Sequence, residues 1–293
     1  MAEVATSARS DQLLVIIDPM ARRTDGESVR IAKDVLSAGA ATKVCLPEDP
    51  EEFARALARR GARRPVLIGD DGALVRTVAL LHRRRELAGC VLSVVPVGGA
   101  LTLAGALGVP TGAVAAARAV LDGVERRLDV LVDESDGVVL GALRIPALPL
   151  PGTPPAQADG GDGGPDGARP WLRTAQSLVR TLVPVRPARS TAVPGAGPSR
   201  LRVEVDGAPL IDLDQPVEGV TVTPGRGGVA EVEVRPVSVG AEASLLVASG
   251  RVVTVTGADF RYRADGGVAG PVRRRTWRVL EEAWGLTVPQ RGA

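Results

Sequence analysis

Ile68-Gly69-Asp70-Asp71-Gly72-Ala73-Leu74 is the stretch of the chain that says most about its fold. It joins a short apolar run at 65–68 to a segment with helical periodicity at 73–84. Glycine lets backbone N–H groups come close to an anion, and the N-terminus of the following helix carries partial positive charge. The stretch is therefore a candidate phosphate-binding loop, although Asp-Gly is also common in ordinary turns.

The segments around this loop alternate between strands and helices, as they do in βαβ units. Apolar runs predict strands at 13–17, 42–46, 65–68, 91–95, 128–132 and 138–145, and helical spacing predicts helices at 27–37, 50–60 and 73–84, followed by two Ala-rich helices up to residue 121. Continuous apolar runs are typical of strands that are buried on both faces of a parallel sheet. Residues 11–146 are accordingly predicted to form a parallel α/β domain, which the family resemblance given below makes one of the nucleotide-binding type.

The rest of the chain follows a different pattern. Residues 147–170 are rich in Pro, Gly and Asp, a composition that predicts a flexible linker. An amphipathic helix is expected at 171–183, and from residue 201 onward apolar and polar residues alternate in short runs separated by turns. Residues 171–293 are therefore predicted to form a β-rich C-terminal domain that begins with a helix. The last predicted strand, 286–288, is compatible with either domain.

Bulk composition limits the classes of partner. The chain has 293 residues, of which 45% are hydrophobic and only 2% aromatic, so its core must be aliphatic. A net charge of +2 is too small to indicate a nucleic-acid partner. Arginine clusters at 59–60, 63–64, 83–85 and 273–275 are compatible with peripheral contact to an anionic membrane, but solvated helix ends and loops explain them more simply.

Several residue types are rare enough to be informative. Cys45 and Cys90 have no metal-ligand spacing and are expected to be buried, reduced thiols of a cytoplasmic protein. His82 is the only histidine; we expect it at the surface near a helix end, which argues against Ser-His-Asp catalysis and a His-rich metal site. Trp277 and Trp284 are expected in the core or in a groove wall. The longest apolar stretch, 98–121, is interrupted and is not expected to span a membrane.

A second group of motifs follows the fourth predicted strand. It comprises Pro96-Val97-Gly98-Gly99 and, after three residues, Leu-Ala-Gly-Ala-Leu-Gly-Val-Pro at 103–110. With the first loop, these motifs resemble the diacylglycerol kinase catalytic family, which includes bacterial lipid kinases and sphingosine kinases. That family has N-P near the end of its first strand, then G-G-D-G-T, then P-x-G-T-x-N-D-x-A-x-x-L-G-I-P. The matching positions are Pro19, Gly69, Asp71, Gly72, Pro96, Gly98, Ala104, Leu107, Gly108 and Pro110, and Asp129 and Asp265-Gly266 match later acidic positions.

The resemblance implies a function in phospholipid metabolism. In that family the first domain holds ATP, the second shapes a lipid groove, and Mg²⁺ assists transfer of the γ-phosphoryl group to a lipid hydroxyl. By resemblance, the nucleotide would be bound by Pro19, Gly69, Asp71, Gly72, Gly98 and Gly99, and Asp71 would also bind the metal. Asp265 or Asp129 would take the proton of the acceptor hydroxyl.

The chain departs from the family pattern at its chemical positions. Asp70 replaces the second glycine of G-G-D-G-T, where its carboxylate would either face the phosphates or turn away from them. The other replacements are Asp18 for the asparagine of N-P, Ala73 for the threonine, Gly99-Ala100-Leu101-Thr102 for T-x-N-D, Gly267 for the last residue of D-G-E, and Arg-Gly-Gly-Val at 226–229 for the acidic D-D-G-x-L stretch. The chain is thus predicted to be a divergent member with weak or lost kinase activity, a pseudokinase candidate.

Three functions are compatible with these residues. The first is an ATP-dependent lipid kinase that works with altered residues, and the second is a non-catalytic regulatory protein that binds nucleotide or lipid in the same cleft. The third is a structural partner of another protein. A measurement of MgATP binding distinguishes these three functions most directly. The sequence does not define the lipid substrate or the oligomeric state. The expected location is cytoplasmic, with at most peripheral contact to the inner face of the membrane.

Overall fold

The structure is a computed structural model, and it describes residues 12–147, 198–237 and 244–290. Nearly all of the predicted linker and the whole predicted helix at 171–183 lie outside the described residues. The described residues before 148 and from 198 onward belong to one compact unit. No helix in this described part is long and apolar enough to cross a membrane.

The first half of the chain has the predicted βα alternation. Its elements are β1 (Gln12–Ile17), α1 (Pro19–Thr24), α2 (Gly26–Gly39), β2 (Ala41–Cys45), α3 (Pro50–Ala58), β3 (Arg64–Gly69), α4 (Asp71–Arg83), β4 (Val91–Pro96), α5 (Thr102–Ala106) and α6 (Ala113–Asp122). The four strands are parallel and lie in the order β4-β3-β1-β2. The predicted parallel α/β domain is confirmed.

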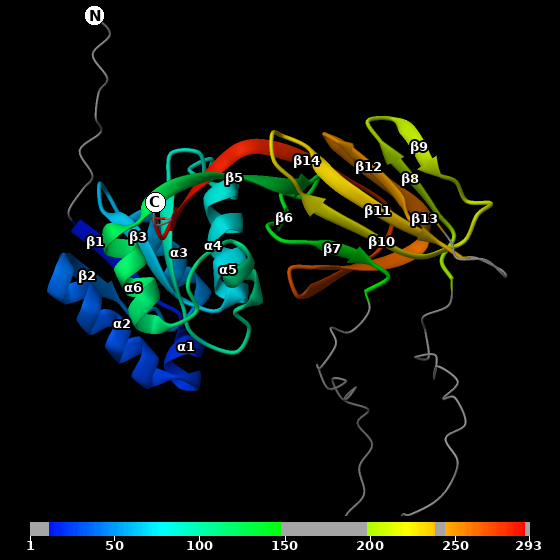
Figure 1. Cartoon of the computed structure of the whole chain (residues 1–293). Coiled ribbons are helices and arrows are strands. Elements are labelled where there is room, and N and C mark those ends of the chain that lie inside the picture. The colour runs from blue at the N-terminus through cyan, green and yellow to red at the C-terminus, as the bar shows by residue number, and fades with distance from the viewer. Residues whose placement is uncertain (1–11, 148–197, 238–243, 291–293) are drawn as a thin grey trace, which may run out of the picture. The chain divides into compact units, whose positions relative to one another are not determined.

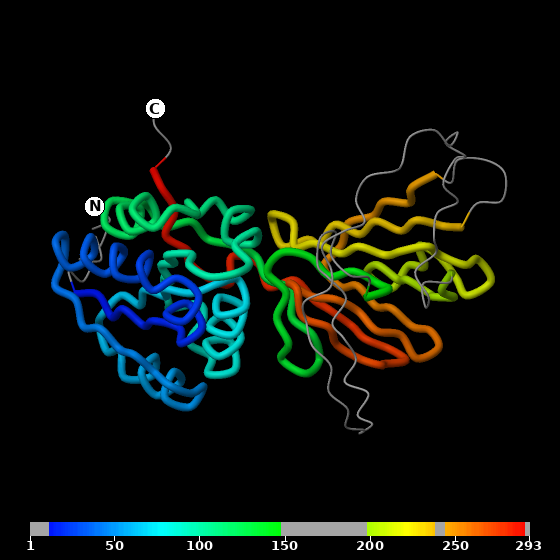
Figure 2. The backbone as a smooth tube through the Cα atoms, turned by 90° about the horizontal axis from the view of Figure 1, so that it is seen from below, coloured from blue at the N-terminus to red at the C-terminus, as the bar shows by residue number. Residues whose placement is uncertain are grey.

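Helices cover both faces of this sheet because the side chains of a strand alternate between its faces. Leu13, Val15 and Ile17 of β1 pack with apolar residues of α1, α2 and α6, whereas Leu14 and Ile16 pack with those of α3, α4 and α5. Figures 1 and 2 show α2 and α6 on one side of the strands and α3 on the other. The chain runs from β1 to β2 on one side and then crosses back to β3 on the other. Ligands bind at such a reversal, at the carboxyl ends of the strands.

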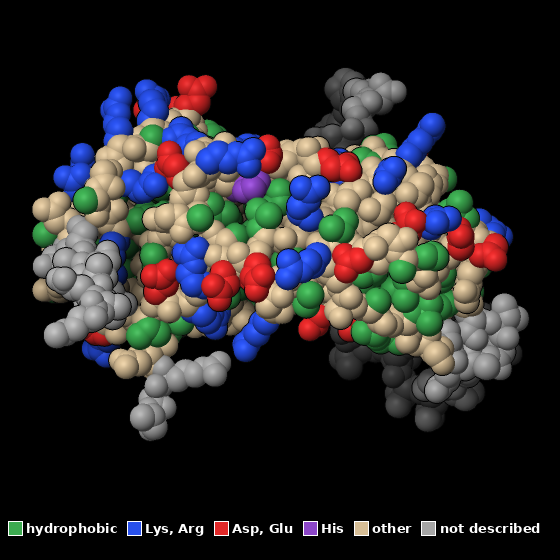
Figure 3. Space-filling view, turned by 90° about the horizontal axis from the view of Figure 1, so that it is seen from above, with side chains coloured by type: hydrophobic (Ala, Val, Ile, Leu, Met, Phe, Trp, Pro, Cys, Tyr) green, Lys and Arg blue, Asp and Glu red, His purple; other side chains and the backbone are tan. Residues whose placement is uncertain are grey.

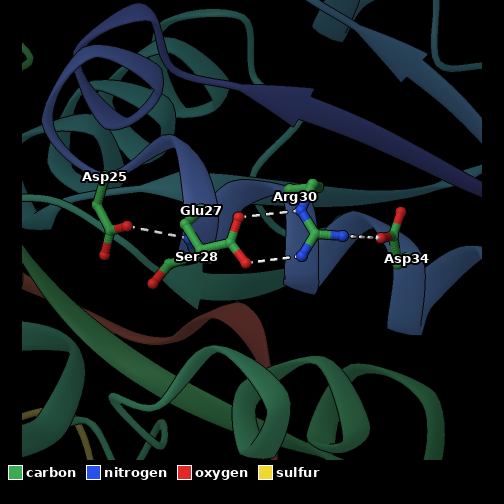
Figure 4. A network of polar contacts seen from close by, with 5 residues as sticks. All are labelled: Asp25, Glu27, Ser28, Arg30 and Asp34. Atoms are coloured by element: carbon green, nitrogen blue, oxygen red, sulfur yellow. Dashed lines mark hydrogen bonds and ion pairs between the residues drawn. The ribbon is translucent and has the colours of Figure 1, made fainter.

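Aspartate side chains mark where the helices begin. Asp25 accepts a hydrogen bond from the backbone N–H of Ser28 at 3.0 Å, and this bond caps α2. Along the exposed face of α2, Arg30 then pairs with Glu27 and Asp34 (Figure 4). Asp18, Asp49 and Asp70 cap α1, α3 and α4 in the same way. Each of these carboxylates satisfies a backbone donor that the first helical turn leaves without a partner.

The second half of the described chain is built from strands. They are β5 (Val124–Asp133), β6 (Val138–Val139), β7 (Leu143–Ile145), β8 (Leu201–Val205), β9 (Ala208–Ile211), β10 (Val217–Pro224), β11 (Ala230–Pro236), β12 (Leu246–Gly250), β13 (Val252–Ala264) and β14 (Gly267–Val288). Antiparallel pairing gives the order β12-β11-β10-β7-β13-β14, and β8 pairs with β13 and β9. The predicted β-rich C-terminal region is confirmed. The single strand expected at 138–145 is divided into β6 and β7.

The β-rich core is aliphatic, as the composition requires, and it contains one aromatic pair. Alternate valines of β8 and β11 are buried together with Trp277. The rings of Tyr262 and Trp277 meet edge to face, with centroids 5.2 Å apart. Trp277 and Trp284 are 0% and 1% exposed, which confirms their expected place in the core.

The long strand β14 belongs to both parts of the fold. Its earlier residues pair with β13, and Gly285 and Leu286 pair in parallel with Val91 and Leu92 of β4. The hydroxyls of Ser93 and Thr287 are 2.8 Å apart and strengthen this junction. The last predicted strand therefore joins the parallel sheet, while β7 pairs with β10 and β13 of the β-rich part.

Two sequence expectations about single residues need correction. His82 is not at the surface: it is 6% exposed, and its Nε2 atom lies 3.2 Å from Oδ1 of Asp136. Its place follows from the apolar stripe of α4, since it lies four residues after the buried Val78. Cys90 is buried, and burial raises the pKa of its thiol, but Cys45 is only partly buried.

The junction of α6 with the end of β14 gives a stability prediction. A Cβ atom at Gly123 would press on the carbonyl oxygen of Ala119 and lie 2.5 Å from that of Val288. Gly123→Ala is expected to destabilise the protein by about 1–3 kcal/mol, because backbone must move to accept the methyl group. This corresponds to a fall in Tm of about 2–4 °C for each kcal/mol, measured by thermal denaturation.

Gly89→Ala is the matched control, because a Cβ there has no neighbour within 4 Å. Its Tm should stay close to that of the wild type. Equal Tm values for the two variants would contradict the close packing of β14 against α6.

Candidate functional site

The loop between β3 and α4 is closed by the side chain of Asp70. As the N-cap of α4, Asp70 accepts a hydrogen bond from the N–H of Ala73 through Oδ1, at 2.9 Å. A phosphate bound at this helix would use that donor. The carboxylate of Asp70 thus occupies a donor that a phosphate would use, so of the two expected orientations it does not have the one that turns away from the phosphate position.

Two glycines let the loop pack against the chain that follows β4. A Cβ atom at Gly69 would lie 2.8 Å from the Cβ of Ala73, and one at Gly98 would lie 3.1 Å from the Cβ of Asp70. Gly98 also has a φ of 129°, which side chains rarely adopt. The nearby Gly99 has open space around it. Gly69 and Gly98 are thus required by packing and backbone conformation.

Asp71 connects α4 to α5. Its side chain is buried, 5% exposed, and accepts hydrogen bonds from the N–H groups of Leu103 at 2.8 Å and Ala104 at 3.0 Å. The hydroxyl of Thr102 lies 3.3 Å from the same carboxylate. The N-cap residue of α5, Leu101, makes no side-chain capping bond. Asp71 therefore caps α5 from a distant position in the sequence.

Asp265, in the turn between β13 and β14, lies near Asp71. Its carboxylate accepts hydrogen bonds from the N–H groups of Leu140 at 2.6 Å, Gly141 at 2.8 Å and Ala142 at 3.1 Å. Burial raises the pKa of Asp265 and the charge of Asp71 adds to this rise, while the three backbone bonds act in the opposite direction. The fold thus brings together two of the residues that the sequence singled out.

The other candidate base, Asp129, has different partners. Its Oδ2 accepts a hydrogen bond from the N–H of Gly228 and its Oδ1 accepts one from the N–H of Glu282, both at 2.8 Å. Asp129 therefore joins β5 to the turn between β10 and β11 and to a bulge in β14 where Glu282 has a φ of 45°. These bonds give Asp129 a structural role at the junction of three strands.

Asp18 and Pro19 begin α1 at the end of β1. Asp18 is 5% exposed and accepts a hydrogen bond from the N–H of Met20 at 2.9 Å. Its Oδ2 also forms an ion pair with Nη2 of Arg76, at 2.8 Å. The guanidinium of Arg76 lies beside the glycine loop, because a Cβ at Gly72 would be 3.2 Å from its Nη1. Arg76 was missed from the sequence. The available signal was its position three residues after Ala73, which puts the two residues on the same side of the helix.

A cavity of about 540 Å³ opens where β1, β2 and β3 end. Its position matches the reversal in strand order, where ligands of open α/β sheets bind. Four apolar side chains form one part of its lining: Pro19, Met20, Pro50 and Phe53. Six charged side chains form another part: Asp18, Glu48 and Asp49 with Arg23, Arg76 and Arg83.

The carboxylates of the site do not suit a magnesium ion. Mg²⁺ requires near-octahedral oxygen coordination, usually with one or two carboxylates. Asp71 and Asp265 each accept three hydrogen bonds from protein donors, and a carboxylate has about four acceptor positions. The described residues contain no group of three or more His, Cys, Asp or Glu side chains that could hold a metal ion. The expected metal-binding role of Asp71 thus has no support from its contacts.

Comparisons with known proteins agree with this geometry. Residues 12–132 match the diacylglycerol kinase catalytic domain. A solved structure of a diacylglycerol kinase from Bacillus anthracis str. Sterne is similar with a TM-score of 0.65 and 12% identity, covering 95% of this chain and 97% of that one. A second structure from the same organism has a TM-score of 0.65 and 12% identity, with 96% and 98% covered. No curated protein matches the chain significantly.

The structural likeness, at this low identity, concerns the fold, which extends over both the α/β part and the β-rich part. The sequence match covers β1 to β5 and includes the glycine loop, Asp71 and the lining of the cavity. Residues 12–132 of this chain belong to the diacylglycerol kinase catalytic-domain family.

Proposed function

We propose that this diacylglycerol-kinase-like protein binds an adenine nucleotide in the cavity beside Gly69–Ala73 and transfers its phosphoryl group weakly or not at all. One observation carries the proposal. An open cavity of about 540 Å³ adjoins a glycine loop whose carboxylates are all hydrogen-bonded within the protein. The open cavity is explained by nucleotide binding. The engagement of the loop carboxylates is explained by the absence of efficient phosphoryl transfer.

The cavity has the size and lining that a nucleotide needs. Ligand pockets commonly measure about 300–1,000 Å³ and combine apolar walls with a few polar groups. Phe53, Met20 and the two prolines offer an apolar surface for a base, and arginines from α1 and α4 offer donors for phosphate oxygens. This supports a nucleotide with its base toward α3 and its phosphates toward α4.

Weak transfer follows from the side chains at the loop. Phosphoryl transfer depends on positioning and on neutralising the charge of the phosphate oxygens. Ala73 has no hydroxyl to donate, and the carboxylate of Asp70 adds negative charge where phosphate would bind. Asp265 is the better candidate for a base, since it lies near Asp71, but three backbone bonds already engage it. Loss of a general base costs about 10²–10⁴-fold in rate.

Membrane contact receives little support from the arginine clusters. Arg60 pairs with Glu86, Arg273 with Asp259 at 3.0 Å, and Arg275 donates to the hydroxyl of Ser135 at 2.7 Å. On the face shown in Figure 3, basic and acidic side chains are interspersed. We therefore propose nucleotide binding rather than lipid binding as the function of the described site.

The first prediction concerns the unmodified protein. ATP should raise its Tm, because a ligand that binds only the folded state stabilises it by about 2.7 kcal/mol at 100 times its Kd. Diacylglycerol in mixed micelles with ATP and Mg²⁺ or Mn²⁺ should give no phosphatidic acid above a control without protein. Turnover at the roughly 1–100 s⁻¹ of ordinary kinases would contradict weak transfer, and an unchanged Tm would contradict nucleotide binding.

The second prediction concerns Asp70→Asn. Asn caps helices about as well as Asp, so the fold should be kept while one negative charge is removed beside the phosphates. A unit charge at about 4 Å in water contributes about 1 kcal/mol, so ATP should bind about fivefold more tightly, measured by isothermal titration calorimetry.

Asp25→Asn is the matched control, since Asp25 caps α2 through Ser28 and belongs neither to the glycine loop nor to the lining of the cavity. It removes the same charge from the same kind of cap, and its Kd for ATP should equal that of the wild type. If both variants bind ATP as the wild type does, Asp70 does not oppose phosphate.

A further inference from the structure

We infer that the cavity holds the free polyphosphate of ATP through arginine side chains and without a divalent cation. The inference rests on the proposed nucleotide binding and specifies how the phosphates are neutralised. Its starting point is the disagreement between a family that uses magnesium and a site whose carboxylates are engaged by backbone donors.

Three arginines line the cavity from two helices. Arg76 and Arg83 are seven residues apart on α4, which is about two turns, so they lie on the same face. Ala73 and Leu80 line the cavity from that face as well. Arg23 lies in the last turn of α1. A ligand in the cavity therefore meets guanidinium groups from both helices.

The acidic side chains of the lining are already neutralised or engaged. Asp18 caps α1 and pairs with Arg76, and Asp49 caps α3 through the N–H of Glu52 at 2.7 Å. Glu48 forms an ion pair with Arg22 at 2.8 Å. These contacts occupy both oxygens of Asp18 and one oxygen each of Asp49 and Glu48, which lowers the number of oxygens that could bind a metal.

Two of the arginines, by contrast, have uncommitted donors. Among the described residues, the guanidinium groups of Arg23 and Arg83 have no hydrogen-bond partner and no ion pair within 4 Å. Arg22 lowers the pKa of Glu48, and the more distant Arg23 does so to a smaller extent. Each guanidinium has five N–H donors in a planar fork that matches two phosphate oxygens.

The charge of the ligand decides which form of ATP this site prefers. Mg²⁺ neutralises part of the polyphosphate, so MgATP presents less negative charge to the arginines than free ATP does. A site that depends on guanidinium groups should therefore bind free ATP more tightly. A site with metal ligands has the opposite preference, because the metal bridges protein and phosphate oxygens.

The experiment is calorimetric titration of the full chain with ATP, in EDTA and in excess Mg²⁺, at equal ionic strength. The inference expects binding in EDTA, about threefold tighter than in Mg²⁺. Binding that is about tenfold weaker in EDTA would overturn the inference and leave the proposed function standing. Absence of binding under both conditions would overturn the proposed function, and the inference with it.

Variants assign the binding to the arginines. Arg83→Gln and Arg23→Gln should each weaken ATP binding in EDTA about tenfold, because each removes charged hydrogen bonds to phosphate. Arg84→Gln is the control: it removes the same charge one residue away, from a side chain that does not line the cavity. Equal Kd values for Arg83→Gln and Arg84→Gln would overturn the role of Arg83. Unchanged Tm values would show that the variants remain folded.

Discussion

The site depends most on the hydrogen bonds between the buried carboxylate of Asp71 and the first turn of α5. The N–H of Asp71 also donates to the carbonyl of Ala100 at 2.9 Å, so one residue fixes both connections that follow β3 and β4. Leu103, positioned in this way, lies against Gly141, whose N–H binds Asp265. A continuous set of contacts thus runs from the glycine loop to the turn between β13 and β14. A buried carboxylate is stable there because protein donors replace its lost hydration.

The use of carboxylates as helix caps also determines which backbone donors remain for a phosphate. Helix N-termini bind anions with the same backbone donors that a capping aspartate uses. Asp18, Asp70 and Asp71 occupy such donors at α1, α4 and α5. The capping carboxylates and a bound phosphate would therefore use the same backbone N–H groups. In this chain those groups donate to the capping carboxylates. In the proposed nucleotide complex, the polyphosphate then depends on side-chain cations, of which the cavity has three on α1 and α4.

Much of the fold was predictable because its signals are local. Continuous apolar runs predicted the parallel strands, and residues 69–73 span the end of β3 and the first turn of α4, as their glycines indicated. The course of β14 was not predictable, because Arg273–Arg275 and a bulge at Glu282 interrupt the alternation of apolar and polar residues along the strand. Its pairing with β4 is also a long-range contact, which local sequence does not indicate. The direction of Asp70 was open because the sequence alone does not show whether its carboxylate faces the phosphate position or turns away from it. His82 was misplaced because the arginines after it obscured the apolar stripe of α4.

The residues that carry a family resemblance need not be those that carry its chemistry. Gly69 and Gly98 are required because a side chain at either position would crowd Ala73 or Asp70, whether or not a nucleotide is bound. The presence of these glycines indicates the conformation of the loop and does not indicate catalytic activity. Under the proposed function, catalytic chemistry would depend instead on charge and donors at residues 70, 73 and 101 and on the freedom of Asp265. Packing therefore preserves the loop while its polar side chains change, and the match over residues 12–132 is compatible with a site that binds without reacting.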